Sequence, residues 1–243
     1  MIRSKKPLRA VPAMAALVLA ATPVAGAAPG TEAQPRSGEL CSSVYMLVAR
    51  GSNEDPGPGA MVRLVNRIKE ATERPIEDVA VDYPATAESI PDYADSTAQG
   101  AAEVRRLLTE AVAACPDREI VMLGYSQGAH ITGDALAGGG GGRLGPETAP
   151  VPSEVSDNVV AVVHMGDPRF MVGEPFDVGT AHRDGRFPRG ENQRLTAFAA
   201  TIRSYCDAGD VFCDSGKIWP VHYVYLPKYG DEAARFVVDA IGG

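Results

Sequence analysis

The chain has 243 residues, of which 45% are hydrophobic, and no Gly-, Pro- or Ser-rich linker separates apolar blocks of domain size. This length is enough for one well-buried domain, and the sequence offers no boundary between two. The formal net charge is −8, and four of the cations lie near the N-terminus, so the rest of the chain is more acidic still. Nucleic acid is therefore a poor partner, and the acidity is expected to keep the protein in solution.

The N-terminus has the pattern of a secretory signal peptide. Four cations within residues 3–9 precede an apolar stretch over residues 10–21, and the small residues 25–27 follow. A positive segment, a short apolar segment and small residues are what signal cleavage requires. The apolar stretch is too short to span a membrane, and no other stretch approaches the roughly 20 apolar residues of a transmembrane helix.

These features predict how the chain is divided. We expect residues 1–27 to be a signal peptide, residues 28–38 to be disordered, and residues 39–243 to form a single domain. The mature protein should then be secreted. The sequence leaves open whether it stays on the cell envelope, and we expect a monomer without a transmembrane segment.

All four cysteines, Cys41, Cys115, Cys206 and Cys213, lie beyond the predicted signal peptide. An even number in an oxidising compartment predicts two disulfides. Of the three possible pairings, the spacing favours Cys41 with Cys115 and Cys206 with Cys213. No cysteine pair has the spacing of zinc ligands, so we expect no metal and no other cofactor.

Short apolar runs alternate with helical patterns along the chain. The runs are nearly continuous, which is typical of strands buried on both faces, and they cover residues 44–49, 79–81, 120–124, 159–165 and 201–205. The helical patterns cover residues 59–71, 96–114, 129–137 and 231–241. This alternation predicts an α/β fold with a doubly wound, mostly parallel five-stranded sheet, whose ligands bind beyond the carboxyl ends of the strands.

Two further segments lack periodicity. Five consecutive glycines at residues 138–142 are expected to form a flexible loop far from the chemistry, with a mobile flap as the alternative. Residues 169–194 are rich in Gly and Pro and are expected to run over the functional edge of the sheet.

The pentapeptide GYSQG places Ser126 between an apolar run and a helical pattern. A serine in such a tight turn has its hydroxyl exposed, and the flanking Gly124 and Gly128 leave room where strand and helix crowd together. The N–H of Gln127 opens the helix, where an unpaired donor stabilises an oxyanion. We interpret Ser126 as a nucleophile, although glycine turns of this composition also occur without a catalytic role.

A serine nucleophile needs a base and an acid, which on this fold follow in the order Ser, Asp, His. Among the four histidines, His222 alone has this order, and His130, His164 and His182 are interpreted as structural or unsuitably placed. Asp210 is the preferred acid because it follows the last predicted strand and lies between two cysteines that would restrict its loop. Its rivals are Asp207, Asp214 and Asp167, and the last is better suited to capping a turn.

A second oxyanion donor should come from the loop after the first predicted strand. Ser52 is our candidate there, through its N–H and hydroxyl, with a plain chain-turning loop as the alternative. A phosphate-binding loop is rejected, because the segment GSNEDPGPG has no Walker lysine and carries acidic Glu54 and Asp55.

With these residues in this order, the sequence resembles the cutinase family of small secreted serine esterases. The resemblance spans most of the mature chain and depends on Cys41 before ARGSNE, on GYSQGA around Ser126, on the GDP at residues 166–168, and on Cys206, Asp210, Cys213 and His222 in order. It implies a lidless α/β-hydrolase fold of cutinase type in a single catalytic domain, with an active site open to solvent. It also implies a Ser126, Asp210 and His222 triad, an oxyanion hole from Ser52 and Gln127, and the two disulfides favoured above.

Apolar residues near His222 predict the kind of substrate. Residues 218–221 would form an apolar rim beside the base, and Phe170, Met171, Val172 and Phe176 another wall, although Trp219 could equally belong to the core. We expect hydrolysis of esters with short to medium acyl chains, or of insoluble polyester or lipid. The alternatives are a carbohydrate O-deacetylase on the same triad and a non-catalytic lipid-binding module.

Overall fold

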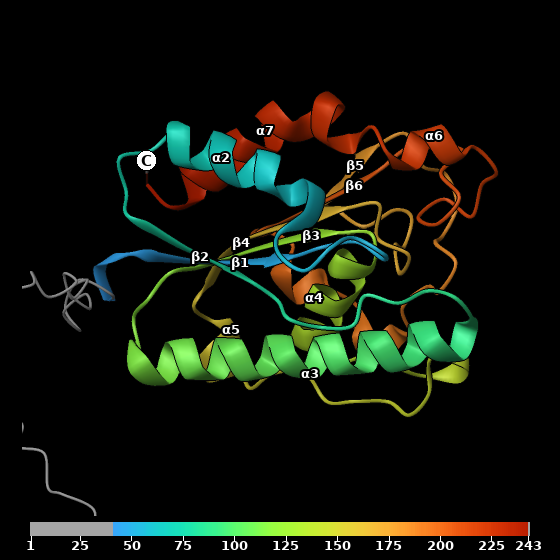
Figure 1. Cartoon of the computed structure of the whole chain (residues 1–243), viewed down its shortest axis with the longest axis horizontal. Coiled ribbons are helices and arrows are strands. Elements are labelled where there is room, and N and C mark those ends of the chain that lie inside the picture. The colour runs from blue at the N-terminus through green and yellow to red at the C-terminus, as the bar shows by residue number, and fades with distance from the viewer. Residues whose placement is uncertain (1–40, 243) are drawn as a thin grey trace, which may run out of the picture. The chain divides into compact units, whose positions relative to one another are not determined.

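The computed structural model describes residues 41–242. The predicted signal peptide (residues 1–27) and the predicted disordered segment (residues 28–38) lie outside the described residues. In the described part, helices cover both faces of one sheet (Figure 1). This architecture confirms the predicted doubly wound α/β class.

The sheet has six parallel strands in the order β2-β1-β3-β4-β6-β5. They are β1 (Val44–Ala49), β2 (Ile76–Ala80), β3 (Ile120–Tyr125), β4 (Val159–Met165), β5 (Asp177–Gly179) and β6 (Ile202–Cys206). The prediction of five strands is wrong by one, because β5 was not expected. This strand has three residues, none of them fully buried, and it lies inside the Gly- and Pro-rich residues 169–194, where no apolar run indicates a strand.

Four longer helices form the outer layers. Helices α2 (Val62–Glu70) and α7 (Tyr225–Ala240) cover one face of the sheet, and α3 (Ile90–Ala114) and α4 (Gln127–Ala137) cover the other (Figure 1). The remaining helices are short: η1 (Gly59–Met61), η2 (Gly142–Leu144), α5 (Ser153–Ser156), η3 (Glu191–Gln193), η4 (Thr196–Phe198) and α6 (Trp219–His222).

Strand β1 illustrates why the apolar runs are continuous. Val44, Met46 and Val48 belong to the hydrophobic core under α2 and α7. Tyr45 and Leu47, which alternate with them, belong to the core under α3 and α4. Because successive side chains of a strand point to opposite faces, a strand with helices on both faces needs apolar residues at every position.

Helices α3 and α7 each begin six residues earlier than the sequence pattern predicts, at residue 90 instead of 96 and at residue 225 instead of 231. Helix α3 begins after Ser89, whose hydroxyl accepts a hydrogen bond from the N–H of Asp92 at 3.2 Å, and Pro91 lies in its first turn. Helix α7 carries Pro227 near its start. Proline is tolerated there because the first N–H groups of a helix have no partner inside it. These first turns lack apolar periodicity, so the sequence pattern does not reveal them.

The glycine segment predicted as a flexible loop is folded against the protein. Gly139 pairs with Thr148 in an isolated antiparallel bridge, and its carbonyl accepts a hydrogen bond from Gln193 Nε2 at 2.9 Å. Gly138 and Gly140 have φ values of 87° and 73°. Such positive φ values suit glycine, so the run of glycines provides a tight turn.

Both predicted disulfides are present, Cys41–Cys115 and Cys206–Cys213. The first ties the residues before β1 to the end of α3, and the second closes a small ring after β6. The ring fixes the loop that contains Asp210.

The strand order locates the ligand-binding edge. From β1 the chain crosses to β2 on one side, whereas the strands after β3 are added on the other side. The carboxyl ends of β1 and β3 therefore flank the point at which the winding direction reverses, where open α/β sheets bind their ligands. Ser52 follows β1 and Ser126 follows β3, so both candidate site residues lie at this point.

Candidate active site

Ser126 occupies a strained turn between β3 and α4. Its backbone has φ 53° and ψ −117°, its N–H donates to Met165 O at 2.8 Å, and its carbonyl accepts from His130 N at 3.1 Å. A Cβ at Gly124 would lie 2.6 Å from Ala129 Cα, and one at Gly128 would lie 2.0 Å from Ala49 O. Only glycine fits at these two positions. The GYSQG sequence thus forms the tight elbow that it predicts.

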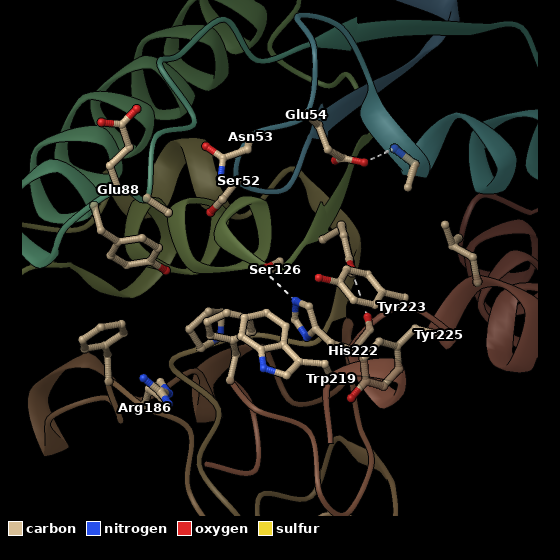
Figure 2. Close-up of a pocket in the computed structure, with 18 of the residues that line it drawn as sticks. Ser52, Asn53, Glu54, Glu88, Ser126, Arg186, Trp219, His222, Tyr223 and Tyr225 are labelled. Atoms are coloured by element: carbon tan, nitrogen blue, oxygen red, sulfur yellow. Dashed lines mark hydrogen bonds between the residues drawn. The ribbon is translucent and has the colours of Figure 1, made fainter. Parts of the chain in front are cut away.

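His222 joins Ser126 to Asp210. Its Nε2 lies 2.9 Å from Ser126 Oγ, and its Nδ1 lies 2.8 Å from Asp210 Oδ2. The ring is packed between Tyr125, with centroids 5.3 Å apart, and Phe212, with centroids 4.7 Å apart. Figure 2 shows the imidazole directed at Ser126. The structure therefore brings the three predicted groups within hydrogen-bonding distance in the order that proton transfer from the serine requires.

Asp210 is held by more donors than the sequence indicated. Its Oδ1 accepts hydrogen bonds from the N–H groups of Phe212 at 2.7 Å and Cys213 at 3.0 Å. Its Oδ2 accepts a hydrogen bond from the Tyr225 hydroxyl at 2.6 Å. Burial by itself opposes ionisation, but the bonds from His222, Tyr225 and the backbone hold the pKa of Asp210 below its usual value. The carboxylate is therefore charged and fixed in orientation.

The rival aspartates have other partners. Asp207 accepts hydrogen bonds from Lys228 at 2.7 Å and Tyr229 at 2.8 Å. Asp214 pairs with Arg183 at 2.9 Å. Asp167 accepts the N–H of Arg169 at 2.8 Å, the turn-capping contact expected of it. Their hydrogen bonds within the described residues leave Asp210 as the carboxylate that contacts His222.

Two of the other histidines are buried. His130 Nδ1 lies 2.8 Å from the Tyr93 hydroxyl, and His164 Nε2 lies 2.9 Å from Thr132 Oγ1. Burial is the main cause that lowers the pKa of His130 and brings the pKa of His164 down to about 4. Buried rings bonded to neighbouring hydroxyls, and for His130 also to Asp134 Oδ2 at 3.2 Å, fit the structural interpretation made from the sequence. His182, in contrast, is largely exposed.

Ser52 and Gln127 are hydrogen-bonded to each other next to Ser126. Ser52 Oγ donates to Gln127 Oε1 at 3.0 Å, and Gln127 Nε2 donates to Thr86 O at 3.1 Å. Gln127 is fully buried and is the first residue of α4, where a helix leaves its N–H groups unpaired. The two residues predicted to supply an oxyanion hole are therefore in contact.

The loop that carries Ser52 is fixed by Glu54, which the sequence analysis did not select. Its Oε2 accepts the N–H of Gly51 at 2.6 Å, and its Oε1 accepts the N–H of Ala60 at 2.8 Å. One carboxylate thus holds both ends of the loop. Glu54, whose negative charge disfavours phosphate binding, therefore fixes the conformation of this loop, and no local sequence pattern indicates that function.

Residues 169–194 are anchored to α4, the helix after Ser126, by a buried ion cluster. Arg169 and Arg189 donate to Asp134 of α4 at 3.0 and 2.9 Å. Burial opposes ionisation of Asp134, but His130 and the two guanidinium groups hold the pKa of this carboxyl far below its usual range. This anchoring fixes the segment that contributes a wall of the pocket next to Ser126.

Ser126 and His222 open into a pocket of about 640 Å³. In Figure 2, Asn53, Glu88 and Arg186 lie to one side of Ser126, and Tyr223 and Tyr225 lie to the other. The carboxylate of Glu54, which also lines the pocket, lies on the same side as the two tyrosines, so charged groups occur on both sides of Ser126. The further lining residues of the pocket are largely apolar and include Ala60, Ile90, Tyr93, Phe187, Phe212, Leu226 and Pro227.

The predicted apolar rim is exposed, but one predicted wall is wrong. Trp219 and Ile218 are 54% and 53% exposed, so Trp219 is not a core residue. Phe170 and Phe176 are buried in the core. Other residues of the same excursion and the following loop, among them Phe187 and Phe212, take their place in the pocket. The composition of a long segment without periodicity did not reveal which aromatic rings turn inward.

Residues 41–242 contain no group of three or more His, Cys, Asp or Glu side chains arranged to hold a metal ion. Within the same range, no helix combines the length and the apolar character of a membrane-spanning segment.

Comparison with known proteins gives concordant matches. The family model described as Cutinase matches residues 40–241. Acetylxylan esterase 2 of Talaromyces purpureogenus is 34% identical over 88% of this chain and 94% of its own length. Cutinase 11 of Verticillium dahliae is 32% identical over 91% of this chain and 75% of its own length. The catalytic core domain of acetyl xylan esterase from Trichoderma reesei superposes with a TM-score of 0.75, at 32% identity over 82% of this chain and 99% of that domain.

Proposed function

The chain belongs to the cutinase family of ester hydrolases, and on this premise we propose that it cleaves acyl esters through an acyl-serine intermediate formed on Ser126. The observation that carries the proposal is the continuous pair of contacts from Ser126 Oγ to His222 and from His222 to Asp210, at 2.9 and 2.8 Å. A non-catalytic lipid-binding module has no need of this arrangement, which disfavours that alternative.

In the proposed reaction, His222 Nε2 takes the proton of Ser126 while Oγ attacks the acyl carbonyl. The N–H groups of Ser52 and Gln127 stabilise the oxyanion, and the Ser52 hydroxyl is oriented by the Gln127 side chain. The imidazolium, stabilised by Asp210, then protonates the departing alcohol. Water repeats the sequence and releases the acid and the free serine.

The substrate is proposed to be an ester with a short to medium acyl chain, or an insoluble polyester or lipid. Support comes from the apolar lining of the pocket, which includes the exposed Trp219 and Tyr223. A second candidate is an O-acetylated carbohydrate. The charged side chains of Glu88 and Arg186 in the pocket lining favour it, as does the likeness to two proteins named acetylxylan esterase.

We further propose that the protein is exported. The N-terminal pattern of cations, apolar residues and small residues supports this, and so do the two disulfides, because such bonds persist in oxidising compartments. A monomeric state is an expectation from the sequence alone, and the sequence leaves open whether the protein stays on the cell envelope.

The proposal is tested by hydrolysis assays on the wild-type protein and Ser126→Ala. The wild type should release nitrophenol from p-nitrophenyl butyrate, and the variant should fold normally without measurable turnover. Undiminished hydrolysis by the variant would contradict the assignment of the nucleophile. Assays with tributyrin and with acetylated xylan then distinguish the two substrate classes, because a lipid esterase prefers the former and a carbohydrate deacetylase the latter.

A further inference from the structure

The Asp210 carboxylate has four hydrogen-bond donors, and one of them is a side chain outside the proposed triad. Oδ1 accepts two backbone N–H groups, whereas Oδ2 is shared between His222 Nδ1 at 2.8 Å and the Tyr225 hydroxyl at 2.6 Å. The phenol and the imidazole therefore compete for the negative charge of a single oxygen atom. Hydrogen bonds to a carboxylate are about twice as strong as neutral ones, so this competition is energetically significant.

The direction of the phenol hydrogen bond is set by its surroundings. The Tyr225 oxygen accepts the N–H of Asp207 at 3.1 Å, so its own proton is available to Asp210. Tyr225 is 1% exposed. Burial, and then the charge of Asp210, raises the pKa of the phenol far above its usual value, so it stays protonated and remains a donor.

The fold places Tyr225 directly beside His222. Tyr225 is the first residue of α7, and its ring stands edge-on to His222 with centroids 6.3 Å apart. A Cβ at Gly166 would lie 2.8 Å from His222 Cε1 and 3.1 Å from Tyr225 Cε2. The glycine thus makes room for both rings, which lie side by side near Asp210.

We propose that Tyr225 is a positioning residue of the catalytic centre, which acts through Asp210 and sets the acidic limit of activity. The inference rests on the proposed function. By donating to Asp210 Oδ2, the phenol takes up part of the charge that would otherwise hold the protonated imidazole of His222. A base that keeps its proton too firmly cannot accept the proton of Ser126, so without the phenol the enzyme should lose activity at a higher pH.

Several ionisable groups of the described residues face the His222 ring or its immediate neighbours. They are Asp210 from the loop after β6, Tyr125 from β3, Tyr223 and Tyr225 beside the ring, and Arg186, whose guanidinium lies over the Phe212 ring. The carboxylates of Glu54 and Asp207 act on Tyr125 and Tyr225. Tyr125 donates its hydroxyl to His222 O rather than to the imidazole or the carboxylate. Tyr225 is therefore the phenol placed to change the charge that the imidazole meets.

The test is the pH dependence of kcat/KM for p-nitrophenyl butyrate in wild type and Tyr225→Phe, measured from about pH 4.5 to about pH 9. The acidic limb of the variant should move upward by about 1 pH unit. Tyr229→Phe is the matched control, because it removes a phenol of the same helix that donates to Asp207 at 2.8 Å instead. Its acidic limb should coincide with that of the wild type.

An acidic limb that stays in place or moves downward in Tyr225→Phe overturns the proposal, as does an equal shift in the control. A second variant guards against misfolding. Incorporation of 3,5-difluorotyrosine at position 225 keeps the ring and makes the hydroxyl a stronger donor, so the limb should then move to lower pH. Absence of hydrolysis by the wild type would instead contradict the proposed function, so the two failures are distinguishable.

Discussion

Replacing Gly166 with alanine should impair His222, the proposed base, while leaving the fold intact. Gly166 follows β4 and has φ 67°, and an added Cβ would lie 2.8 Å from His222 Cε1 and 3.0 Å from His222 Nδ1. Carbon atoms pack best at about 3.5 to 4.0 Å, so the imidazole would have to move by at least about half an ångström. Both of its hydrogen bonds, to Ser126 and to Asp210, would lengthen or bend.

The two consequences have different magnitudes. A side chain in the left-handed region costs about 1 to 2 kcal/mol, which should appear as a modest loss in the free energy of unfolding. Displacement of a catalytic group by a fraction of an ångström to 1 Å costs on the order of 10-fold to 100-fold in rate. The kcat/KM for p-nitrophenyl butyrate should fall by such a factor, and urea unfolding should reveal the smaller loss of stability.

Gly142→Ala is the matched control. Gly142 has φ 55°, and an added Cβ meets no atom within 4 Å, so this variant has the backbone strain without the contact. Its stability should fall by a similar amount, and its kcat/KM should stay unchanged. Full activity in Gly166→Ala, or equal losses of activity in both variants, would show that contact with the added Cβ does not displace His222.

Two further predictions concern acid stability and the oxyanion loop. Burial is the main cause that lowers the pKa of His164 from 6.5 to about 4, so between these values the unfolded chain binds a proton that the folded protein does not. The stability contributed by neutral His164 should be complete above pH 6.5 and should fall by about 3 kcal/mol as the pH drops to about 4. The free energy of unfolding in urea should therefore depend less on pH in His164→Gln than in the wild type. Glu54→Ala removes the acceptor of two loop N–H groups. It should lower kcat on the order of 10-fold with little change in KM, as measured by steady-state kinetics.

Exposed residues provide the controls for both predictions. His182 has a side chain that is 64% exposed, and His182→Gln should leave the pH dependence of unfolding unchanged. Glu191 has a side chain that is 90% exposed, and Glu191→Ala should leave kcat unchanged. An equally steep pH dependence in His164→Gln would show that burial of this ring does not cause acid sensitivity. A rise in KM alone in Glu54→Ala would place that residue in substrate binding.

Local patterns in the sequence were sufficient for most of the fold. Strands with helices on both faces are continuously apolar, so β1 and β4 have the predicted bounds, residues 44–49 and 159–165. The elbow at Ser126 was also predictable, because the pattern of strand, GYSQG and helix is local; a Cβ at Gly124 would meet the nearby Ala129, although one at Gly128 would meet Ala49 of β1. Both disulfides followed from four cysteines and their spacing.

The first turns of α3 and α7 and strand β5 could not be predicted in this way. Ser89 and Pro91 fix the start of α3 through a cap and a preset backbone angle rather than through apolar periodicity. Strand β5 has three residues and acquires its partner only when residues 169–194 fold back along β6. Its pairing is a tertiary effect that no short window of sequence contains.

The candidate site likewise contains residues that could be predicted from the sequence and residues that could not. Ser126, Asp210 and His222 could be selected because the chemistry prescribes the residue types and the fold prescribes their order. Tyr225 and Glu54 could not, because a tyrosine or glutamate has no required place in that order. Their tasks depend on which acceptor or donor lies opposite after folding, and those partners are fixed only by the packing of α7 and of the loop after β1.

In the proposed reaction Ser126 carries the acyl group during turnover. Intact-mass measurement and peptide mapping after reaction with a p-nitrophenyl alkylphosphonate, which replaces the acyl ester and leaves a stable adduct, show which residue reacts. We predict one phosphonyl group per chain, located on the peptide that contains Ser126, with nitrophenol release in equal amount and no adduct in Ser126→Ala. Labelling of another residue, or an equal adduct in Ser126→Ala, would contradict this role of Ser126.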